Sequence, residues 1–276
     1  MSKAVQKSET IKRYRLGIAL SGGGARGFAH AGALAALEEG GHKPDVIAGV
    51  SAGSVVAALY AAGNPPRKIL ELFAESKAKS FVDFKPHKGG MFSLAPFKKI
   101  IEKNLGRYSR IEDLPIPVYI GATDFDRGTS VIFSEGDIAE RVVASCSIPI
   151  AFSPTTIDGV KYVDGGVLRN HPAWIIRDIC EILIGINVSP LDSKLNESSE
   201  SFLSVALRTY NLMAKANQKE DMEMCDLNIQ TPEIAHYPTF DLRHIENIYL
   251  SGFSRMRRAL REAGLWKQPL PEKQSS

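Results

Sequence analysis

The sequence predicts an α/β protein in which a mainly parallel central sheet is covered by helices on both faces. Three observations lead to this prediction. Short apolar runs alternate with helical runs, glycine-rich turns join the first of them, and no internal repeat or long Gly/Ser linker divides the chain. Strands that alternate with helices are typical of parallel sheets, because a parallel crossover needs a helix to return the chain. With 276 residues, 44% of them hydrophobic, the chain is long enough to bury a large core.

The first half of the chain contains the clearest alternation. An apolar run at residues 16–20 predicts a strand, and residues 28–39 predict a helix that ends at Gly40-Gly41. Residues 45–50 predict the second strand, and residues 54–62 predict the second helix. Each strand is therefore followed by a helix, as parallel pairing requires.

The remaining elements are less regularly spaced. They are strands at residues 118–123, 130–134 and 182–188, a strand pair around 157–162, and helices at residues 137–145, 200–224 and 245–263. Residues 85–97 combine glycines and prolines with four apolar side chains, so we expect an irregular loop that packs its own side chains. A mobile apolar flap over a hydrocarbon-binding site is the alternative. We expect one domain over residues 1–276, with a core at about 14–190 on which helices at about 199–264 pack.

The charge balance and the cysteines exclude several classes of protein. Thirty-four Lys and Arg against 31 Asp and Glu give a net charge of +3, which offers no general case for nucleic-acid binding. The three cysteines share no metal-ligand spacing, so we expect reduced thiols in a cytoplasmic protein and no bound metal or cofactor. The first fifteen residues hold no apolar segment typical of a signal peptide. The uncharged residues 46–63 are interrupted by glycines and serines, which predicts a strand, a turn and a helix instead of a membrane span.

A Gly-x-Ser-x-Gly motif, Gly49-Val-Ser51-Ala-Gly53, lies between the second predicted strand and the second predicted helix. A serine on such a sharp turn projects its hydroxyl away from the sheet, and the two glycines remove side chains that would crowd the backbone. We therefore expect Ser51 to be a nucleophile. A packed turn of small residues is the alternative.

A glycine-rich segment, Ser21-Gly-Gly-Gly-Ala-Arg26-Gly27, follows the first predicted strand and begins a helix. Backbone amides at such a turn attract negative charge, so the segment can form the oxyanion hole that a serine nucleophile needs. The same residues also fit the dinucleotide fingerprint Gly-x-Gly-x-x-Gly. That alternative lacks its acidic residue at the end of the second strand, where Ser51 stands and Asp45 is at the beginning. A phosphate-binding P-loop is excluded because no Gly-Lys-Ser/Thr follows.

The nucleophile also requires a base, and the residues leave two arrangements open. A Ser–His–Asp triad in the usual α/β-hydrolase order would use His171, His236 or His244, none of which has a distinctive glycine-bearing context. A Ser–Asp dyad would use Asp164, in the turn Asp164-Gly165-Gly166. An aspartate with a pKa near 3.9 is a poor base at neutral pH unless burial raises that pKa.

Four blocks together resemble the patatin-like phospholipases in their compact bacterial form. In chain order they are the glycine loop at 22–27, the serine turn at 49–53, the segment Ala144-Ser-Cys-Ser-Ile-Pro149 and the turn at 164–166. The resemblance covers about residues 14–190, and no motif of the family follows Pro190. It implies a three-layer α/β/α fold and hydrolysis of lipid acyl esters.

Individual roles follow from the same resemblance. It implies that Ser51 is the nucleophile, that Asp164 is the base, and that the segment ending at Pro149 is structural support. It also implies an oxyanion hole formed by the amides of Gly22, Gly23, Gly24 and Ala25, with Arg26 in the basic position that follows. His171, seven residues after Asp164, is a minor candidate for assisting the dyad. The alternative functions are a lipid-binding or regulatory protein with little turnover, and a soluble carboxylesterase or thioesterase.

A lipid substrate implies contact with a membrane surface or micelle. Two groups of basic residues could meet anionic headgroups, and they are Lys98, Lys99 and Lys103, and Arg255, Arg257, Arg258 and Arg261. A solvated helix face is the alternative for both groups. We expect at most a peripheral and transient contact, and the sequence does not indicate an oligomeric state.

Overall fold

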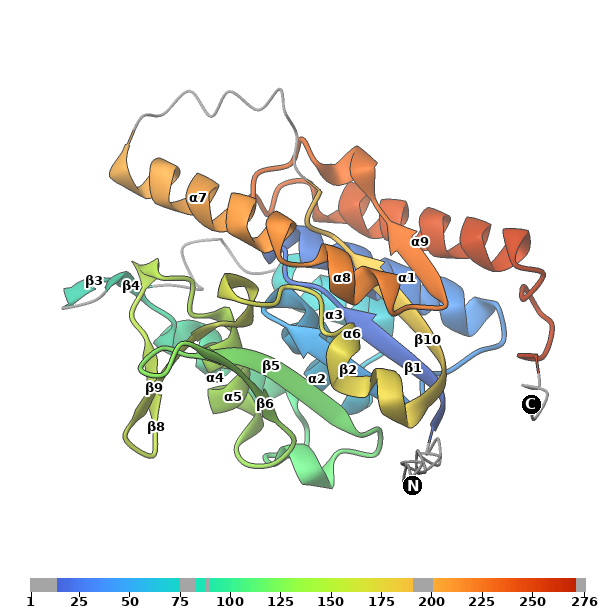
Figure 1. Ribbon diagram of the computed structural model, residues 1–276, viewed down its shortest axis with the longest axis horizontal. Helices are drawn as coiled ribbons and strands as arrows, with labels where there is room; N and C mark the ends of the chain where they lie inside the picture. Colours follow the sequence, from blue (N-terminus) through green and yellow to red (C-terminus); the bar gives the residue numbers. More distant parts are fainter. Residues whose placement is uncertain (1–13, 75–82, 88–89, 191–200, 272–276) are drawn as a thin grey trace, which may run out of the picture.

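A computed structural model of the chain describes residues 14–74, 83–87, 90–190 and 201–271. A central sheet separates two unequal layers of helices, which confirms the predicted α/β class (Figure 1). Within the described residues the sheet has eight strands. Its order is β11 (Leu227–Gln230), β10 (Cys180–Asn187), β1 (Tyr14–Leu20), β2 (Val46–Val50), β5 (Val118–Asp124), β9 (Val160–Asp164) and β8 (Thr155–Ile157), and β6 (Thr129–Phe133) also pairs with β5.

The sheet is parallel in its centre and antiparallel at one side. The strands β11, β10, β1, β2 and β5 pair in parallel, whereas β6, β8 and β9 are joined by antiparallel pairing. The carboxyl ends of parallel strands lie at one edge of a sheet, where the connecting loops can bring side chains together. The turns that follow β1 and β2 therefore meet at the same edge.

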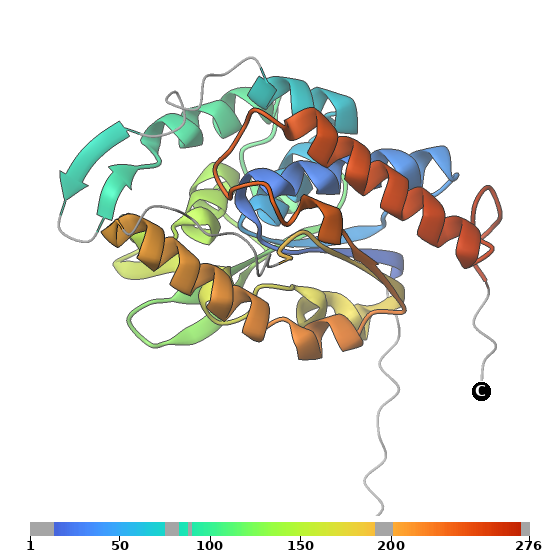
Figure 2. The same cartoon turned by 90° about the horizontal axis from the view of Figure 1, so that it is seen from above.

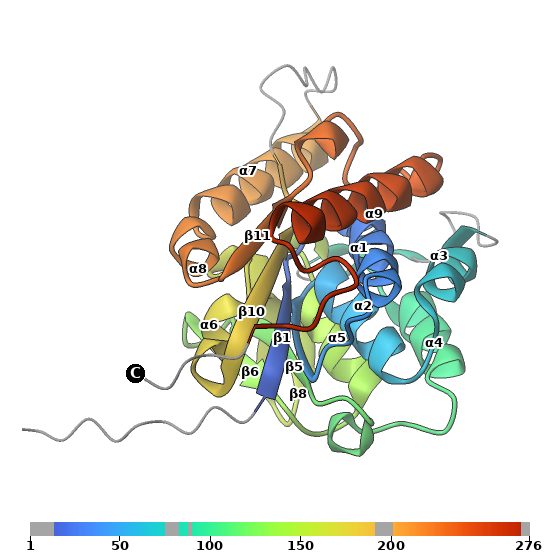
Figure 3. The same cartoon turned by 90° about the vertical axis from the view of Figure 1, so that its right-hand side faces the viewer.

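The helices cover the two faces of the sheet unequally (Figure 3). On one side of the sheet lie α1 (Phe28–Glu39), α2 (Ala52–Ala61) and α5 (Ile138–Cys146), and α3 (Pro66–Ala74), α4 (Ala95–Asn104) and α9 (Ile245–Glu262) pack on these helices. The other face packs against the short α6 (Ala173–Ile176). Seen from above, α7 (Phe202–Ala216) and α8 (Lys219–Glu223) lie on the far side of the sheet from α9 (Figure 2). Short 3-10 turns are η1 (Gly24–Gly27), η3 (Ile111–Asp113), η4 (Gly165–Val167), η5 (Arg177–Ile179) and η6 (Pro232–Ile234).

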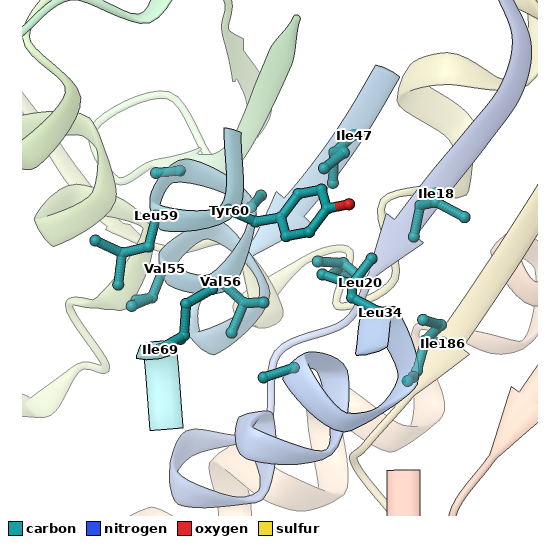
Figure 4. Packing of buried hydrophobic residues seen from close by; sticks show 14 of the residues in the cluster. Ile18, Leu20, Leu34, Ile47, Val55, Val56, Leu59, Tyr60, Ile69 and Ile186 are labelled. Carbon is teal, nitrogen blue, oxygen red and sulfur yellow. The ribbon is translucent and has the colours of Figure 1, made fainter. Parts of the chain in front are cut away.

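The main core follows from the alternation of side chains along the strands. On β1, Ile18 and Leu20 point toward α1 and α2, whereas Ala19 between them faces the α6 side. Figure 4 shows Ile18 and Leu20 with Leu34 of α1 and Leu59 of α2, all of them essentially inaccessible to solvent. Each fully buried Leu or Ile stabilises the fold by roughly 1.5–3 kcal/mol relative to an exposed one. This layer therefore anchors the strands from which the functional turns emerge.

Two predicted segments differ in the structure. Residues 90–93 form β4 (Gly90–Ser93), which pairs with both β3 (Asp83–His87) and β7 (Ile150–Phe152), and α4 begins at Ala95. The prediction of an irregular loop over 85–97 is therefore wrong, although residues 88–89 lie outside the described part. The backbone of β4 is satisfied by a strand about sixty residues further on, which local composition does not reveal. Pro96 is tolerated in the first turn of α4, where its missing N–H has no partner to lose.

The helix predicted at 200–224 is two helices, and residue 200 lies outside the described part. The break falls at Asn217-Gln218, where the Asn217 side chain turns away to donate hydrogen bonds to the carbonyls of Gly166 and Val167. No helix in the described ranges is both long and apolar enough to span a membrane.

Candidate active site

The turn between β2 and α2 holds Ser51 in a strained conformation. Its φ is +51° and its ψ is −124°. Residues other than glycine rarely adopt this left-handed backbone region, which costs roughly 1–3 kcal/mol. Gly49 and Gly53 make the turn possible. A Cβ on Gly49 would lie 2.5 Å from the carbonyl of Gly53, and one on Gly53 would overlap the carbonyl of Leu20. The motif is therefore a sharp turn, and close packing of the backbone requires both glycines.

The segment 144–149 fixes this turn from behind. The amide of Ser51 donates to Ser145 Oγ at 2.8 Å, and Ser145 Oγ donates to the carbonyl of Gly121 on β5 at 2.6 Å. Two residues on, the carbonyl of Ser147 accepts a hydrogen bond from the amide of Asp164 at 3.0 Å. One short segment thus contacts the backbone of both Ser51 and Asp164. The two serines of this segment therefore have a more specific role than general structural support, because they hold Ser51 and Asp164 in position relative to β5.

The glycine loop after β1 lies directly on Ser51, because a Cβ added to Gly22 would be 3.2 Å from Ser51 Cβ. Two amides of the loop are already engaged. The amide of Gly22 donates to the carbonyl of Asn170 at 3.1 Å, and the amide of Ala25 donates to the carbonyl of Thr239 at 2.7 Å. Neither Gly23 nor Gly24 donates its amide to any acceptor among the hydrogen bonds of the described residues. Within the described part of the chain, the amides of Gly23 and Gly24 therefore have no acceptor and are available to a ligand oxygen.

Arg26 is a buried clamp of this loop. Its guanidinium donates to the carbonyl of Gly23 at 3.4 Å, to the carbonyl of Pro190 at 2.9 Å and to Thr239 Oγ1 at 3.3 Å. The loop is further fixed by glycine geometry, since Gly24 has a φ of +59° and a Cβ there would overlap Thr239. The side chain of Arg26 thus holds the shape of the loop through three acceptors.

Asp164 ends β9 and is completely buried. Its Oδ1 caps η4 by accepting from the amide of Gly166 at 2.8 Å, and it also accepts from Tyr210 Oη at 2.9 Å. Burial raises the pKa of Asp164 to about 6, while hydrogen bonding from Ser51, Gly166 and Tyr210 opposes that rise. The carboxyl is therefore a better proton acceptor near neutral pH than an exposed aspartate.

The two residues expected to act together are close in space. The Ser51 hydroxyl is near enough to lower the pKa of Asp164 as a hydrogen-bond donor does. The second carboxylate oxygen, Oδ2, is nevertheless buried without a donor in good hydrogen-bond geometry within the described part of the chain. Such contacts are often long in the absence of substrate and shorten when it binds. Oδ2 is therefore the oxygen available to accept a proton.

Tyr210 and Thr239 were not predicted from the sequence. Tyr210 lies on α7 and reaches Asp164 across 46 positions of the chain, and Thr239 lies in the loop between η6 and α9. Burial and the neighbouring carboxylate hold the pKa of Tyr210 well above its usual range, so its hydroxyl stays a donor. A single tyrosine at a helical position has no local pattern that marks it as functional.

The three histidine candidates are not brought to Ser51 or Asp164 by any hydrogen bond among the described residues. His171 is buried beside Gly185 of β10, where burial and the nearby His30 lower its pKa to about 3 and keep it neutral. Neither of its ring nitrogens has a hydrogen-bond partner in the described ranges. His236 and His244 pack against the ring of Tyr237, with centroids 4.0 and 5.1 Å away. The geometry favours an arrangement without histidine.

A thiol also lies beside the candidate pair. Cys146 is close enough to Ser51, Ser54 and Asp164 to respond to all three, and burial raises its pKa far above the usual range. It is therefore a neutral thiol and not a nucleophile at ordinary pH. Across the described residues, no cluster of three or more His, Cys, Asp or Glu side chains has the geometry to hold a metal ion.

Comparisons with known proteins identify the family of this chain. A family model described as "Patatin-like phospholipase" matches residues 18–176. An uncharacterized NTE family protein of Mycobacterium tuberculosis is 36% identical over 184 residues, which cover 63% of this chain and 49% of that protein. Lysophospholipase NTE1 of Kluyveromyces lactis is 25% identical over 285 residues, which cover 90% of this chain and 19% of that one. This chain thus matches about half the length of the first relative and much less of the second.

The fold has a solved counterpart. VipD from Legionella pneumophila superposes with a TM-score of 0.52 at 14% sequence identity, over 91% of this chain and 67% of that one. At that identity the similarity concerns the fold alone. The α/β/α architecture is therefore shared with a known structure.

Proposed function

Because this chain belongs to the patatin-like phospholipase family, we propose that it is a serine hydrolase that cleaves acyl esters of lipids through Ser51 and Asp164. The observation that carries this proposal is one juxtaposition. A strained, glycine-flanked serine touches the glycine loop at Gly22, where the next two amides have no acceptor among the described residues, and it lies beside a buried carboxyl whose pKa is raised to about 6. Nucleophile, oxyanion donors and base are the three parts that acyl transfer requires.

The reaction begins when Ser51 Oγ attacks the ester carbonyl and Asp164 Oδ2 accepts the hydroxyl proton. The tetrahedral intermediate then releases the alcohol, which takes that proton from Asp164, and the acyl group remains on Ser51. Water attacks the acyl-serine next, again losing a proton to Asp164. The fatty acid leaves, and the proton returns to Ser51. With a pKa of about 6, Asp164 is mostly ionised at pH 7 yet retains basicity.

The proposed oxyanion hole contains fewer amides than the four that the family resemblance implies. Gly22 and Ala25 already donate to backbone carbonyls, which leaves the amides of Gly23 and Gly24 for the developing oxyanion. Each well-placed donor of this kind stabilises the transition state by about 3–4 kcal/mol. Arg26 then acts by holding the loop in shape, since its donors are directed to Gly23, Pro190 and Thr239.

Tyr210 is the positioning residue of this mechanism. Its hydroxyl and the amide of Gly166 both occupy Oδ1 of Asp164, so the free lone pairs of Oδ2 remain for the Ser51 proton. Both donors favour the ionised carboxylate and keep its pKa from rising further in a fully buried site. They therefore hold Asp164 in the charged form at neutral pH.

An apolar cluster beside the site supports a substrate with a hydrocarbon chain. Tyr210 packs in one buried cluster with Ile148 and Phe152, and Phe92, Leu203 and Leu207 line its border. Since the same Tyr210 hydrogen-bonds to Asp164, this apolar surface adjoins the proposed base. A long acyl chain bound there would desolvate hydrophobic area, which favours binding by about 25 cal/mol per Å².

The direct test is hydrolysis of p-nitrophenyl esters with short and long acyl chains by the wild type, Ser51→Ala, Asp164→Asn and His171→Ala. The proposal expects hydrolysis by the wild type, preference for the long chain, and loss of activity in the first two variants only. Loss in His171→Ala as well would favour a triad. A wild type that is inactive on every ester would contradict hydrolysis and favour a lipid-binding or regulatory protein instead. Equal rates on short and long chains would favour a soluble esterase.

A further inference from the structure

The helix α7 carries two different apolar faces. One face holds Leu203, Leu207, Tyr210 and Ala214, which pack toward the site. The other is a stripe of exposed residues, which we call the α7 stripe and which consists of Phe202, Val205, Leu212 and Met213, with exposed fractions of 73%, 58%, 48% and 41%. Their spacing of three, seven and one residues places them along one side of the helix. Four large apolar side chains on one exposed helix face mark an interaction surface.

Polar residues border the α7 stripe along the helix. Ser204, Arg208, Asn211 and Lys215 recur at spacings of four, three and four residues, so they form a neighbouring row. Neither Arg208 nor Lys215 forms an ion pair among those of the described residues. A helix with an exposed apolar face and a cationic border is typical of segments that lie in a lipid–water interface.

The two groups of basic residues that the sequence suggests for contact with headgroups, one on α4 and one on α9, have different surroundings from those of Arg208 and Lys215. Lys98 pairs with Glu102 at 3.6 Å, Arg255 with Glu233 at 2.7 Å, and Arg258 with Glu262 at 2.7 Å. Three of the seven basic residues in those two groups are therefore balanced by carboxylates, whereas Lys99, Lys103, Arg257 and Arg261 form no ion pair among the described residues. The border of α7 differs from both groups because it lies beside a stripe of four exposed apolar side chains, so a lipid surface can contact charged and apolar residues together.

We propose that the α7 stripe docks this chain on a lipid surface that contains anionic headgroups, with Arg208 and Lys215 contacting them. This inference rests on the proposed hydrolysis of lipid esters, which makes a lipid surface the occupant of this face. Its position supports the proposal, because the opposite side of the same helix carries Tyr210, which contacts Asp164. A lipid surface bound at the stripe would thus be separated from the proposed dyad by about the width of this one helix, about 10–12 Å.

The experiment measures cosedimentation with extruded vesicles in the Ser51→Ala background, so that hydrolysis cannot change the lipid. Vesicles of phosphatidylglycerol and phosphatidylcholine are compared with vesicles of phosphatidylcholine alone. In the triple variant Phe202→Ser/Val205→Ser/Leu212→Ser, affinity for the mixed vesicles is expected to fall about a hundredfold. In Arg208→Gln/Lys215→Gln, the preference for the anionic vesicles is expected to fall about tenfold.

The matched control removes exposed apolar residues from elsewhere on the surface. Phe125→Ser/Ile132→Ser/Leu250→Ser changes side chains with exposed fractions of 54%, 41% and 50%, and it is expected to bind vesicles within about twofold of the parent. Melting temperatures check that each variant is folded. If the triple stripe variant does not fold, Phe202→Ser alone is expected to weaken binding about fivefold.

Three results would overturn the proposal. They are a parent chain that does not sediment with either kind of vesicle, a stripe variant that binds as the control does, and a parent dimer that the stripe variant converts to monomers, which would make a second copy the occupant. The proposed vesicle binding and the proposed hydrolysis can also be contradicted independently of each other. A chain that binds vesicles through the stripe but cleaves no ester contradicts the proposed hydrolysis alone, whereas one that cleaves esters without binding vesicles contradicts this inference alone.

Discussion

The part of the chain before Pro190 and the part after residue 201 contribute to the site in different ways. The first part supplies the proposed reacting groups through backbone turns, at Ser51, at the glycine loop and at Asp164. The second part supplies individual side chains that form hydrogen bonds with the site. Tyr210 donates to Asp164, and Asn217 donates to the carbonyls that follow it.

This difference shows what each kind of contact requires. A strained turn needs glycines at fixed neighbouring positions, because a Cβ at Gly49 or Gly53 would meet the backbone. A hydrogen bond from a remote helix needs only one side chain of the right length. We infer that the first part determines which chemistry is possible, while the second part tunes the protonation and the orientation of Asp164.

The largest effects should come from the reacting residues themselves. Ser51→Ala and Asp164→Asn are each expected to lower kcat by at least about 10⁴-fold, and the double variant should lose little more, because the two residues act as one unit. The measurement is kcat on a soluble p-nitrophenyl ester at pH 8. An Asp164→Asn variant within tenfold of the wild type would break the assignment of the base.

The next largest effect should come from Ser145, which supports the Ser51 turn from within the first part of the chain. Ser145→Ala removes the hydroxyl between the Ser51 amide and the Gly121 carbonyl, and takes away the acceptor of the buried Ser51 amide, at about 1–3 kcal/mol. We expect a lower melting temperature and a fall in kcat of about 10–100-fold. The exposed Ser134→Ala is the control and should match the wild type in both measurements. An unchanged melting temperature and kcat for Ser145→Ala would show that the Ser51 turn keeps its conformation without the Ser145 hydroxyl.

A pH profile then tests the contribution of the second part. The base must be ionised, so kcat/KM should rise with pH through about 6, the pKa of Asp164. Tyr210→Phe removes a donor to the ionised form, which raises that pKa and moves the acid limb upward by about one unit. Activity should fall about fivefold at pH 6 and stay within about twofold at pH 9.

Tyr162→Phe on the same strand as Asp164 is the matched control, because its ring packs on Phe133. Its acid limb should not move. A Tyr210→Phe variant that loses the same fraction of activity at every pH would show that Tyr210 serves only packing.

The smallest effect is expected at His171. Because its pKa is lowered to about 3 and it forms no hydrogen bond with the dyad among the described residues, His171→Gln should change kcat by less than about threefold. The acid limb should stay where it is. A loss above a hundredfold would favour a triad and would remove the reason for assigning the base to Asp164 alone.

Sequence patterns predicted most elements of the first part and the helix at 245–263, which is α9, but they predicted none of the contacts that the second part makes with the site. The helix at 28–39 and the strand at 118–123 correspond to α1 and β5, because apolar periodicity and glycine stops are local signals. Pairing of β4 with β7 depends on a distant strand, and so does the burial that raises the pKa of Asp164. The family resemblance implies four oxyanion-hole amides, but sequence alone does not reveal that the amides of Gly22 and Ala25 donate to the carbonyls of Asn170 and Thr239, which only the folded chain brings to the loop.

The central claim is that Ser51 is a nucleophile activated by Asp164, and covalent labelling tests it most directly. A fluorophosphonate ester is added to the folded chain, and the modified peptide is identified by mass spectrometry as a function of time. The account predicts one phosphonyl group on Ser51 and labelling at least about a hundredfold slower in Asp164→Asn. Labelling of a different residue, or an unchanged rate in Asp164→Asn, would contradict it.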